Sequence, residues 1–167
     1  TTTGGAARVM SWLEEFLQQV WLDMKVFCTS VTEQWAVLSI SGPNSREFLK
    51  DLTNIDLSKE NFPFMKFREG EVCGVKARVF RISFTGELSY EVNVPARYGR
   101  YVWEKFMEHG KKYNITPYGT ETMHVLRAEK GFIIVGQDTD GSVTPSDMNM
   151  DWIVSKKKED FLGKRSF

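Results

Sequence analysis

Apolar and polar residues alternate strictly from residue 87 to residue 94, which is typical of a β-strand with one buried face. A turn around Gly86 precedes this stretch, where glycine permits a backbone conformation that a Cβ would strain. We therefore predict that residues 76–95 form a β-hairpin. In its second strand Tyr90 faces the core and Glu91 points away from it.

Three other stretches have the composition of strands. Residues 25–31 and 34–40 are rich in Val, Phe, Thr and Ile and are predicted as two strands joined by a short turn. Residues 151–154 are predicted as a short final strand. In the first strand of the hairpin the apolar phase changes between Val79 and Phe80, which predicts a bulge or burial on both faces.

Helical periodicity accounts for much of the remaining chain. Apolar residues recur at helical spacing over residues 9–20, and we expect this helix to pack one face on a sheet. A glycine-proline turn precedes a helix at 46–52, which Asn44 or Ser45 would cap. Further helices are predicted over 96–110 and 120–130.

The order of these elements predicts an α+β fold, with ferredoxin-like sheets that carry helices on one face. Two such units sharing a cleft would account for the length of the chain. We treat residues 1–167 as one region, with possible sub-units at about 1–60 and 61–167.

Composition narrows the classes of function. The formal net charge is zero, so no global field favours binding to nucleic acid or to a membrane surface. No apolar run is long enough for a transmembrane helix, and no signal peptide is apparent, so we expect a cytoplasmic protein. Cys28 and Cys73 lie far apart without a metal-binding motif, and we expect no metal site.

Two stretches raise the question of ligand binding. In the irregular residues 54–69, Phe62, Phe64 and Phe67 either fill the core under a loop or place one ring against a flat ligand. The polar loop 136–145 resembles a calcium loop, but it lacks the glutamate at the twelfth position that an EF-hand requires.

Glu91 and Arg127 are the most informative pair of charged residues. Arg127 lies at the border of the apolar stripe of its helix, where a guanidinium needs a carboxylate or a ligand acceptor. A salt bridge between Glu91 and Arg127 would satisfy both groups. A planar heterocycle between them would do so too, because a carboxylate accepts two parallel N–H bonds from an amino-pyrimidinone edge while the guanidinium donates to its carbonyl. The residues alone leave both alternatives open.

Several motifs, in order along the chain, resemble the aminomethyltransferase superfamily, whose type member is the glycine-cleavage T protein. Within it, the chain is most similar to the folate-binding region of alpha subunits of heterotetrameric sarcosine oxidases. The motifs are F-T-G-E-L-S-Y-E-V-N-V-P at 84–95, L-R-A-E-K-G-F at 126–132, G-Q-D-T-D-G-S-V-T-P at 136–145 and K-E-D-F-L-G-K-R at 158–165.

This resemblance implies a tetrahydrofolate-binding domain without the family's terminal β-barrel. It implies that Glu91 and Arg127 hold the pterin end of the folate, and that Phe84, where the T protein usually has tyrosine, lines the same site. The family's catalytic carboxylate lies in an upstream segment that this sequence lacks, so no catalytic residue is assigned. We expect the chain to be a fragment that is inactive alone.

The resemblance also implies the wider chemistry. The parent enzyme would demethylate sarcosine oxidatively, and tetrahydrofolate would capture the one-carbon unit as methylenetetrahydrofolate. FAD, FMN and NAD would bind elsewhere in the parent heterotetramer, whose other subunits are the expected partners. Two alternatives remain: a folate-dependent aminomethyltransferase or dimethylglycine-type enzyme, and an interaction domain that has lost its ligand.

Overall fold

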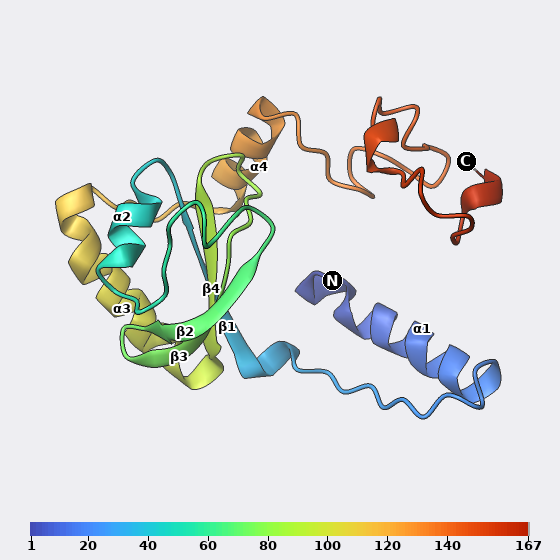
Figure 1. Ribbon diagram of the computed structural model, residues 1–167, viewed down its shortest axis with the longest axis horizontal. Coiled ribbons are helices and arrows are strands. Elements are labelled where there is room, and N and C mark those ends of the chain that lie inside the picture. The colour runs from blue at the N-terminus through green and yellow to red at the C-terminus, as the bar shows by residue number, and fades with distance from the viewer. Residues whose placement is uncertain (167) are drawn as a thin grey trace.

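One antiparallel sheet organises the chain in the computed structural model, which describes residues 1–166 (Figure 1). Its strand order is β1-β4-β3-β2, so β1 and β2 are the edge strands. The strands comprise β1 (Trp35–Ser41), β2 (Phe67–Val72), β3 (Val75–Phe80) and β4 (Ser89–Pro95). The α+β class with an antiparallel sheet is confirmed. The described residues contain one such sheet, and it crosses residue 60 because β1 pairs with β4 along its length.

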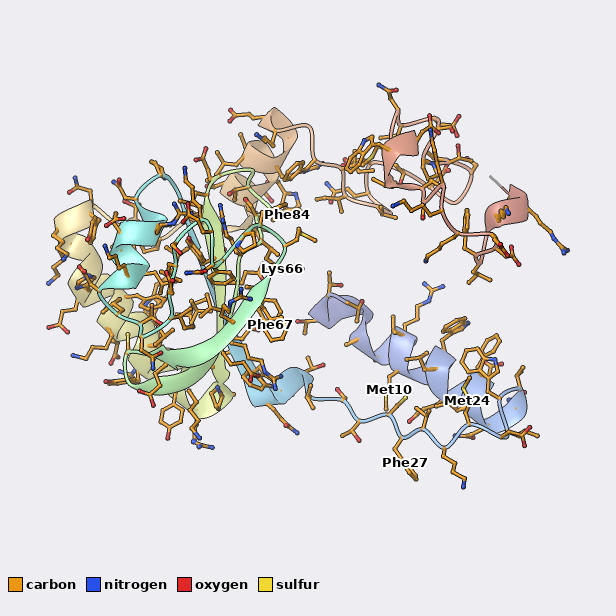
Figure 2. The ribbon with its side chains drawn as sticks, in the orientation of Figure 1. Met10, Met24, Phe27, Lys66, Phe67 and Phe84 are labelled. Atoms are coloured by element: carbon orange, nitrogen blue, oxygen red, sulfur yellow. The ribbon has the colours of Figure 1, made fainter. Side chains whose placement is uncertain are left out.

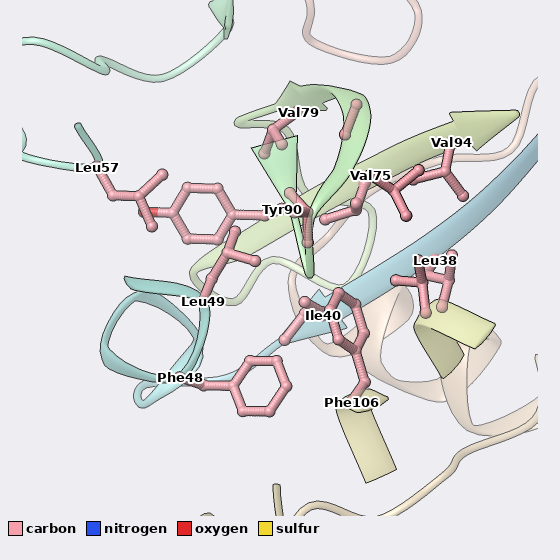
Figure 3. Close-up of a cluster of buried hydrophobic side chains, with 14 of the residues drawn as sticks. Leu38, Ile40, Phe48, Leu49, Leu57, Val75, Val79, Tyr90, Val94 and Phe106 are labelled. Carbon is pink, nitrogen blue, oxygen red and sulfur yellow. The ribbon is translucent and has the colours of Figure 1, made fainter. Parts of the chain in front are cut away.

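The core lies on one face of the sheet. Alternate residues of each strand point to that face, and Tyr90 and Val92 of β4 are fully buried there, as predicted. The helices α2 (Ser45–Lys50) and α3 (Gly99–Gly110) cover the same face. Figure 3 shows Phe48 of α2 and Phe106 of α3 within this cluster, and their rings meet edge to face at 5.3 Å.

The predicted hairpin is present, but its connection is longer than expected. β3 and β4 pair antiparallel, with Phe80 opposite Glu91. After Phe80 the backbone leaves β4, because Arg81 bonds with residues 65 and 66 on the β2 side. The change of apolar phase after Val79 therefore marks the end of a strand, and the predicted bulge is wrong. Residues 81–88 form a loop.

The helices agree with the sequence except at one cap. α4 (Thr120–Glu129) ends before Gly131, whose positive φ of 79° suits a residue without a Cβ. α2 begins at Ser45, and Asn44, one of the two predicted caps, occupies the N-cap position without a side-chain bond. The Asn44 side chain makes no capping bond, and Ser45 Oγ donates to Leu88 O instead. Short 3-10 helices complete the chain: η1 (Thr3–Gly5), η2 (Thr32–Gln34), η3 (Ala96–Tyr98), η4 (Lys111–Tyr113), η5 (Asp151–Ile153) and η6 (Lys164–Ser166).

The two ends of the chain lie apart from the sheet (Figure 1). α1 (Ala6–Gln19) is a helix as predicted, but none of its residues is buried, so the expected packing on a sheet is wrong. Residues 25–31 have no regular secondary structure, and 151–154 contain the 3-10 helix η5, so neither predicted strand is present. Among the described residues, no helix has the length and apolar character needed to cross a membrane.

Candidate functional site

The face of the sheet opposite the core carries a row of side chains in register. Ser39 of β1 pairs with Glu91 of β4, Glu91 pairs with Phe80 of β3, and Phe80 pairs with Phe67 of β2. Residues that pair across neighbouring strands point to the same face. The four side chains therefore form a line across the sheet, which we call the outer row.

Glu91 is the only acid in the outer row, and its environment is unusual. The residue is half-buried, and this burial raises the pKa of its carboxyl group because it disfavours the charged form. In the described part of the chain, its carboxylate takes part in no hydrogen bond or ion pair. Glu69 on the same face, by contrast, lies 2.8 Å from the guanidinium of Arg78. The Glu91 carboxylate thus keeps its capacity to accept hydrogen bonds from a ligand.

Aromatic rings flank this carboxylate on one side. Phe80 and Phe67 stack with their centroids 5.5 Å apart and their planes at 25°. Phe67 is 53% exposed, and Phe84 in the 81–88 loop is 37% exposed. Figure 2 shows Phe84, Lys66 and Phe67 on the same side of the sheet region. Of the three aromatics in the irregular stretch, Phe62 is fully buried in the core, whereas Phe64 and Phe67 are exposed.

Arg127 is buried, and its partner is a carboxylate that the sequence did not indicate. Nη1 and Nη2 both donate to Asp138, with 3.2 Å between Nη2 and Oδ1, and Nη1 also donates to Phe132 O at 3.0 Å. The bond from Arg127 is the main reason why the pKa of Asp138 lies below its usual value, followed by the bond from Ile134 N. A Glu91–Arg127 salt bridge is therefore wrong for the described residues.

The bonds to Asp138 and Phe132 leave one edge of the guanidinium free. A guanidinium has five N–H donors, and these three bonds use three of them. The remaining donors are Nε–H, which is buried and has no acceptor among the described residues, and one N–H of Nη2. Both lie on the same edge of the planar group, which is the edge turned away from Asp138.

The 81–88 loop, which leads into β4, contacts Lys130 at the end of α4. At its tip Gly86 has a φ of +82° and packs so closely on α4 that a Cβ would collide with the Lys130 side chain. Thr85 is buried beside it, and its hydroxyl has no hydrogen-bond partner in the described chain. The loop between β3 and β4 is thus held against the end of α4, the helix that carries Arg127. The structure records no direct contact between Glu91 and Arg127.

Sequence reasoning missed Asp138 and Ser39. Asp138 lies in the polar loop that was compared with a calcium loop, and only the unpaired Arg127 signalled that an acid was needed. The place of Ser39 follows from the pairing register, which composition does not reveal. No group of three or more His, Cys, Asp or Glu side chains that could hold a metal ion occurs within residues 1–166.

Comparisons with known proteins agree with the motifs. A model of the GCVT N-terminal domain matches residues 1–158. Sarcosine oxidase subunit alpha of Corynebacterium sp. (strain U-96) is 58% identical over 169 residues, covering 100% of this chain and 17% of that protein. An aminomethyltransferase of Halothermothrix orenii is 31% identical over 135 residues, covering 81% of this chain and 37% of that protein. The chain thus spans a small part of these relatives.

A solved structure supports the fold. A chain of the heterotetrameric sarcosine oxidase of Corynebacterium sp. U-96, in complex with pyrrole 2-carboxylate, matches with a TM-score of 0.54 over 67% of this chain and 54% of that chain. The two sequences are 15% identical in this match, whereas subunit alpha of the same strain is 58% identical to this chain. The structural match therefore concerns a different segment of that complex, and it shows a shared fold only.

Proposed function

Since this chain belongs to the GCVT N-terminal domain family, we propose that it forms the tetrahydrofolate-binding region of a sarcosine-oxidase-type enzyme. One observation carries the proposal: Glu91 presents a half-buried carboxylate that has no partner among residues 1–166, on a face lined by aromatic rings. An unpaired buried acid is unfavourable, and it is retained where a ligand supplies the missing donors.

Glu91 and Arg127 would hold the two polar sides of the pterin. The carboxylate of Glu91 accepts two parallel N–H bonds from the amino-pyrimidinone edge. The free edge of Arg127, formed by Nε–H and one N–H of Nη2, donates to the ring carbonyl. Asp138 holds the other edge of the same guanidinium and so fixes its orientation. Asp138 acts here as a positioning residue, because it would reach the ligand only through Arg127.

Phe84 would contact a face of the pterin ring. It is partly exposed and lies in the loop that packs against α4. Stacking on an aromatic ring suits a planar heterocycle and needs no hydroxyl group. Phenylalanine in place of the tyrosine usual in the T protein therefore keeps the contact surface and loses one hydrogen-bonding group.

The parent reaction would be one-carbon capture. Oxidation of the N-methyl group of sarcosine, at a flavin bound elsewhere in the parent, leaves an imine. The two nitrogens of tetrahydrofolate would then bond to the methylene carbon, while their two hydrogens pass to the imine nitrogen and its bonds to that carbon break, which yields methylenetetrahydrofolate and glycine. Residues of this chain would bind and orient the folate, and other subunits of a heterotetramer would be its partners. We assign none of the residues of this chain to a catalytic step.

Calorimetric titration of the full-length parent protein with tetrahydrofolate tests the assignment. Glu91→Gln keeps the shape of the side chain and removes its charge, so one of the paired bonds is lost and the other is weakened. Hydrogen bonds to charged groups contribute about 1.5–3 kcal/mol, so we expect affinity to fall about 10- to 100-fold. Glu71→Gln, an exposed acid on β2, is the matched control and should leave the affinity unchanged. Equal affinities for all three proteins would refute the role of Glu91.

A second candidate function is favoured by the similarity to an aminomethyltransferase, 31% identical over 135 residues. In this alternative the chain binds the same folate but receives the one-carbon unit from another donor, such as dimethylglycine. Incubating the parent enzyme with tetrahydrofolate and either sarcosine or dimethylglycine separates the two, with methylenetetrahydrofolate measured by mass spectrometry. An interaction domain without a ligand would give no product and no heat of folate binding.

A further inference from the structure

The aromatic end of the outer row leads to positively charged side chains at the edge strand β2. Phe80 and Phe67 stack in the row, and Lys66 directly precedes Phe67 at the start of β2. Figure 2 shows Phe84, Lys66 and Phe67 one after another on the same side of the sheet region. At its other end the row stops at Ser39 of β1, which offers neither an aromatic ring nor a charge. The two ends of the row therefore differ in chemistry.

The backbone of Lys66 is held beside the 81–88 loop. Arg81 N donates to Lys66 O at 2.9 Å, and Met65 N donates to Arg81 O, also at 2.9 Å. These two bonds attach the residues before β2 to the first residue of the loop that carries Phe84. The fold therefore fixes the place of Lys66 beside the proposed ligand face, although its side chain is exposed.

Lys66 and its neighbour Arg68 carry charges that no acid compensates within residues 1–166. Lys66 takes part in no ion pair there, and the Arg68 guanidinium donates to two backbone carbonyl groups, one of which is Phe67 O at 2.9 Å. Further along the sheet, by contrast, the guanidinium of Arg78 lies 2.8 Å from Glu69. Two uncompensated cations at one edge raise the local positive potential and favour a bound anion.

The shape of tetrahydrofolate matches this arrangement. Its p-aminobenzoylglutamate tail is attached to the pterin on the side opposite the amino-pyrimidinone edge, so with that edge at Glu91 the tail leads away from β4. Two strand spacings, together roughly 10 Å, separate Glu91 from Phe67 in the row. A tail that crosses β3 and β2 passes the Phe80–Phe67 pair and reaches the edge where Lys66 lies. Of the two directions along the row, only this one offers an aromatic surface followed by positive charge.

We propose that Lys66 binds the carboxylates of this tail, so that the folate lies across β4, β3 and β2. The inference rests on the proposed folate function and deepens it, because it assigns the anionic end of the same ligand. Phe67, which is exposed at the edge, lies along the path of the tail. Arg68 strengthens the positive potential at this edge, while its own guanidinium stays bonded to the backbone.

Calorimetric titration of the full-length parent protein with two ligands tests the role of Lys66. Tetrahydrofolate has the tail, whereas methyltetrahydropterin has the same ring system without it. Lys66→Met removes the charge and keeps most of the length of the side chain. Exposed ion pairs contribute little, so we expect the affinity for tetrahydrofolate to fall about two- to fivefold and that for methyltetrahydropterin to stay unchanged. Lys76→Met, an exposed lysine on β3 opposite Glu71, is the matched control and should change neither affinity.

The outcomes separate this inference from the folate function. Glu91→Gln should weaken the binding of both ligands, because it changes a contact with the ring system. Equal affinity of the unmodified and Lys66→Met proteins for tetrahydrofolate, or an equal loss with both ligands, would overturn the role of Lys66 and leave the folate function standing. If the unmodified protein bound neither ligand, the folate function itself would be refuted, and this inference with it.

Tail length and ionic strength provide a second measurement. A triglutamate tail brings more carboxylates to this edge, so at low ionic strength the unmodified protein should bind it more tightly than the monoglutamate. Added salt should reduce this gain, because it screens interactions between exposed charges. Lys66→Met should reduce the gain as well, whereas Lys76→Met should retain it. A gain that survives both Lys66→Met and high salt would show that the tail binds elsewhere and would overturn the proposal.

Discussion

The sheet region, residues 35–115, and the two ends of the chain contain similar apolar residues but use them differently. Every buried residue of the described chain lies between Leu38 and Arg127. α1 has an apolar stripe as regular as that of α3, yet α3 buries Val102 and Phe106 while α1 buries none of its residues. An apolar stripe therefore predicts a helix and the apolar face with which it can pack, but burial of that face also requires a complementary surface.

The sharpest test of this contrast compares two leucines. Leu49 of α2 is fully buried, and Leu49→Ala should lower the free energy of unfolding by about 2–5 kcal/mol. Leu13 of α1 lies on the apolar stripe but is not buried, and Leu13→Ala should cost less than about 1 kcal/mol. Urea denaturation followed by circular dichroism measures both. Similar losses would mean that α1 packs on the sheet region in solution.

The second test concerns the link between α4 and the C-terminal residues. Asp138→Ala removes the carboxylate that binds Arg127, so we expect residues 133–140 to be cleaved several times faster in limited proteolysis. Asp140→Ala is the control, because within residues 1–166 the side chain of Asp140 accepts hydrogen bonds only from Ser142 nearby. Cleavage at equal rates in the two variants would show that the Arg127–Asp138 pair does not hold this segment.

The stabilisation that the Arg127–Asp138 pair gives to this segment should be lost at low pH. The pKa of Asp138 is lowered in the folded protein, so the stabilisation is present above the unfolded value of about 3.9 and is lost as the pH falls through the folded value. Protease resistance of residues 133–140 should therefore decrease in strong acid. A pepsin digestion series at decreasing pH measures it, and the Asp138→Ala protein, which lacks this carboxylate, corrects for the pH dependence of pepsin itself.

The sequence predicted best where a pattern reflects one buried face. The alternation around Tyr90 gave β4, the direction of Tyr90 and the outward direction of Glu91 correctly. β2 was missed because most of its side chains are exposed and its residues F-R-E-G-E-V carry little alternation. Residues 25–31 have the composition of a strand, but composition does not supply the partner that a strand needs.

The site was only partly accessible to sequence reasoning. The unmatched charge of Arg127 indicated that an acceptor was required, and the structure identifies it as Asp138, eleven residues later. The outer row depends on register across four strands that are far apart in sequence, so Ser39 carried no recognisable signal, and Phe67 was noted only as one of three aromatic residues. The motif resemblance pointed to Glu91, while burial and the missing partner give a physical reason for it.

Glu91 should also make stability depend on pH, with a smaller effect than that of Asp138 and with the opposite sign. Its pKa is raised in the folded protein, so its contribution to stability is fully present below the unfolded pKa of about 4.3 and is lost as the pH rises through the folded value. Glu91→Gln should therefore raise the thermal midpoint at pH 7, with no difference near pH 3. Glu71→Gln is the exposed control. An unchanged or lower midpoint at pH 7 would mean that the carboxylate has a stabilising partner.

The smallest effect on stability should come from truncating two tryptophans that are equally exposed but lie in different regions of the chain. Trp12 of α1 is 46% exposed and Trp103 of α3 is 47% exposed, so exposure alone predicts equal losses on truncation. Trp12 packs against its own segment, with ring centroids 4.7 Å from Phe16, whereas Trp103 lines grooves of the sheet region beside Met107 and Ile115. Trp12→Ala should change the unfolding free energy of the sheet by less than about 0.5 kcal/mol, and Trp103→Ala by about 1 kcal/mol or more. Urea unfolding followed at the sheet's circular dichroism signal compares them, and a larger loss for Trp12→Ala would show that α1 packs on the sheet region in solution.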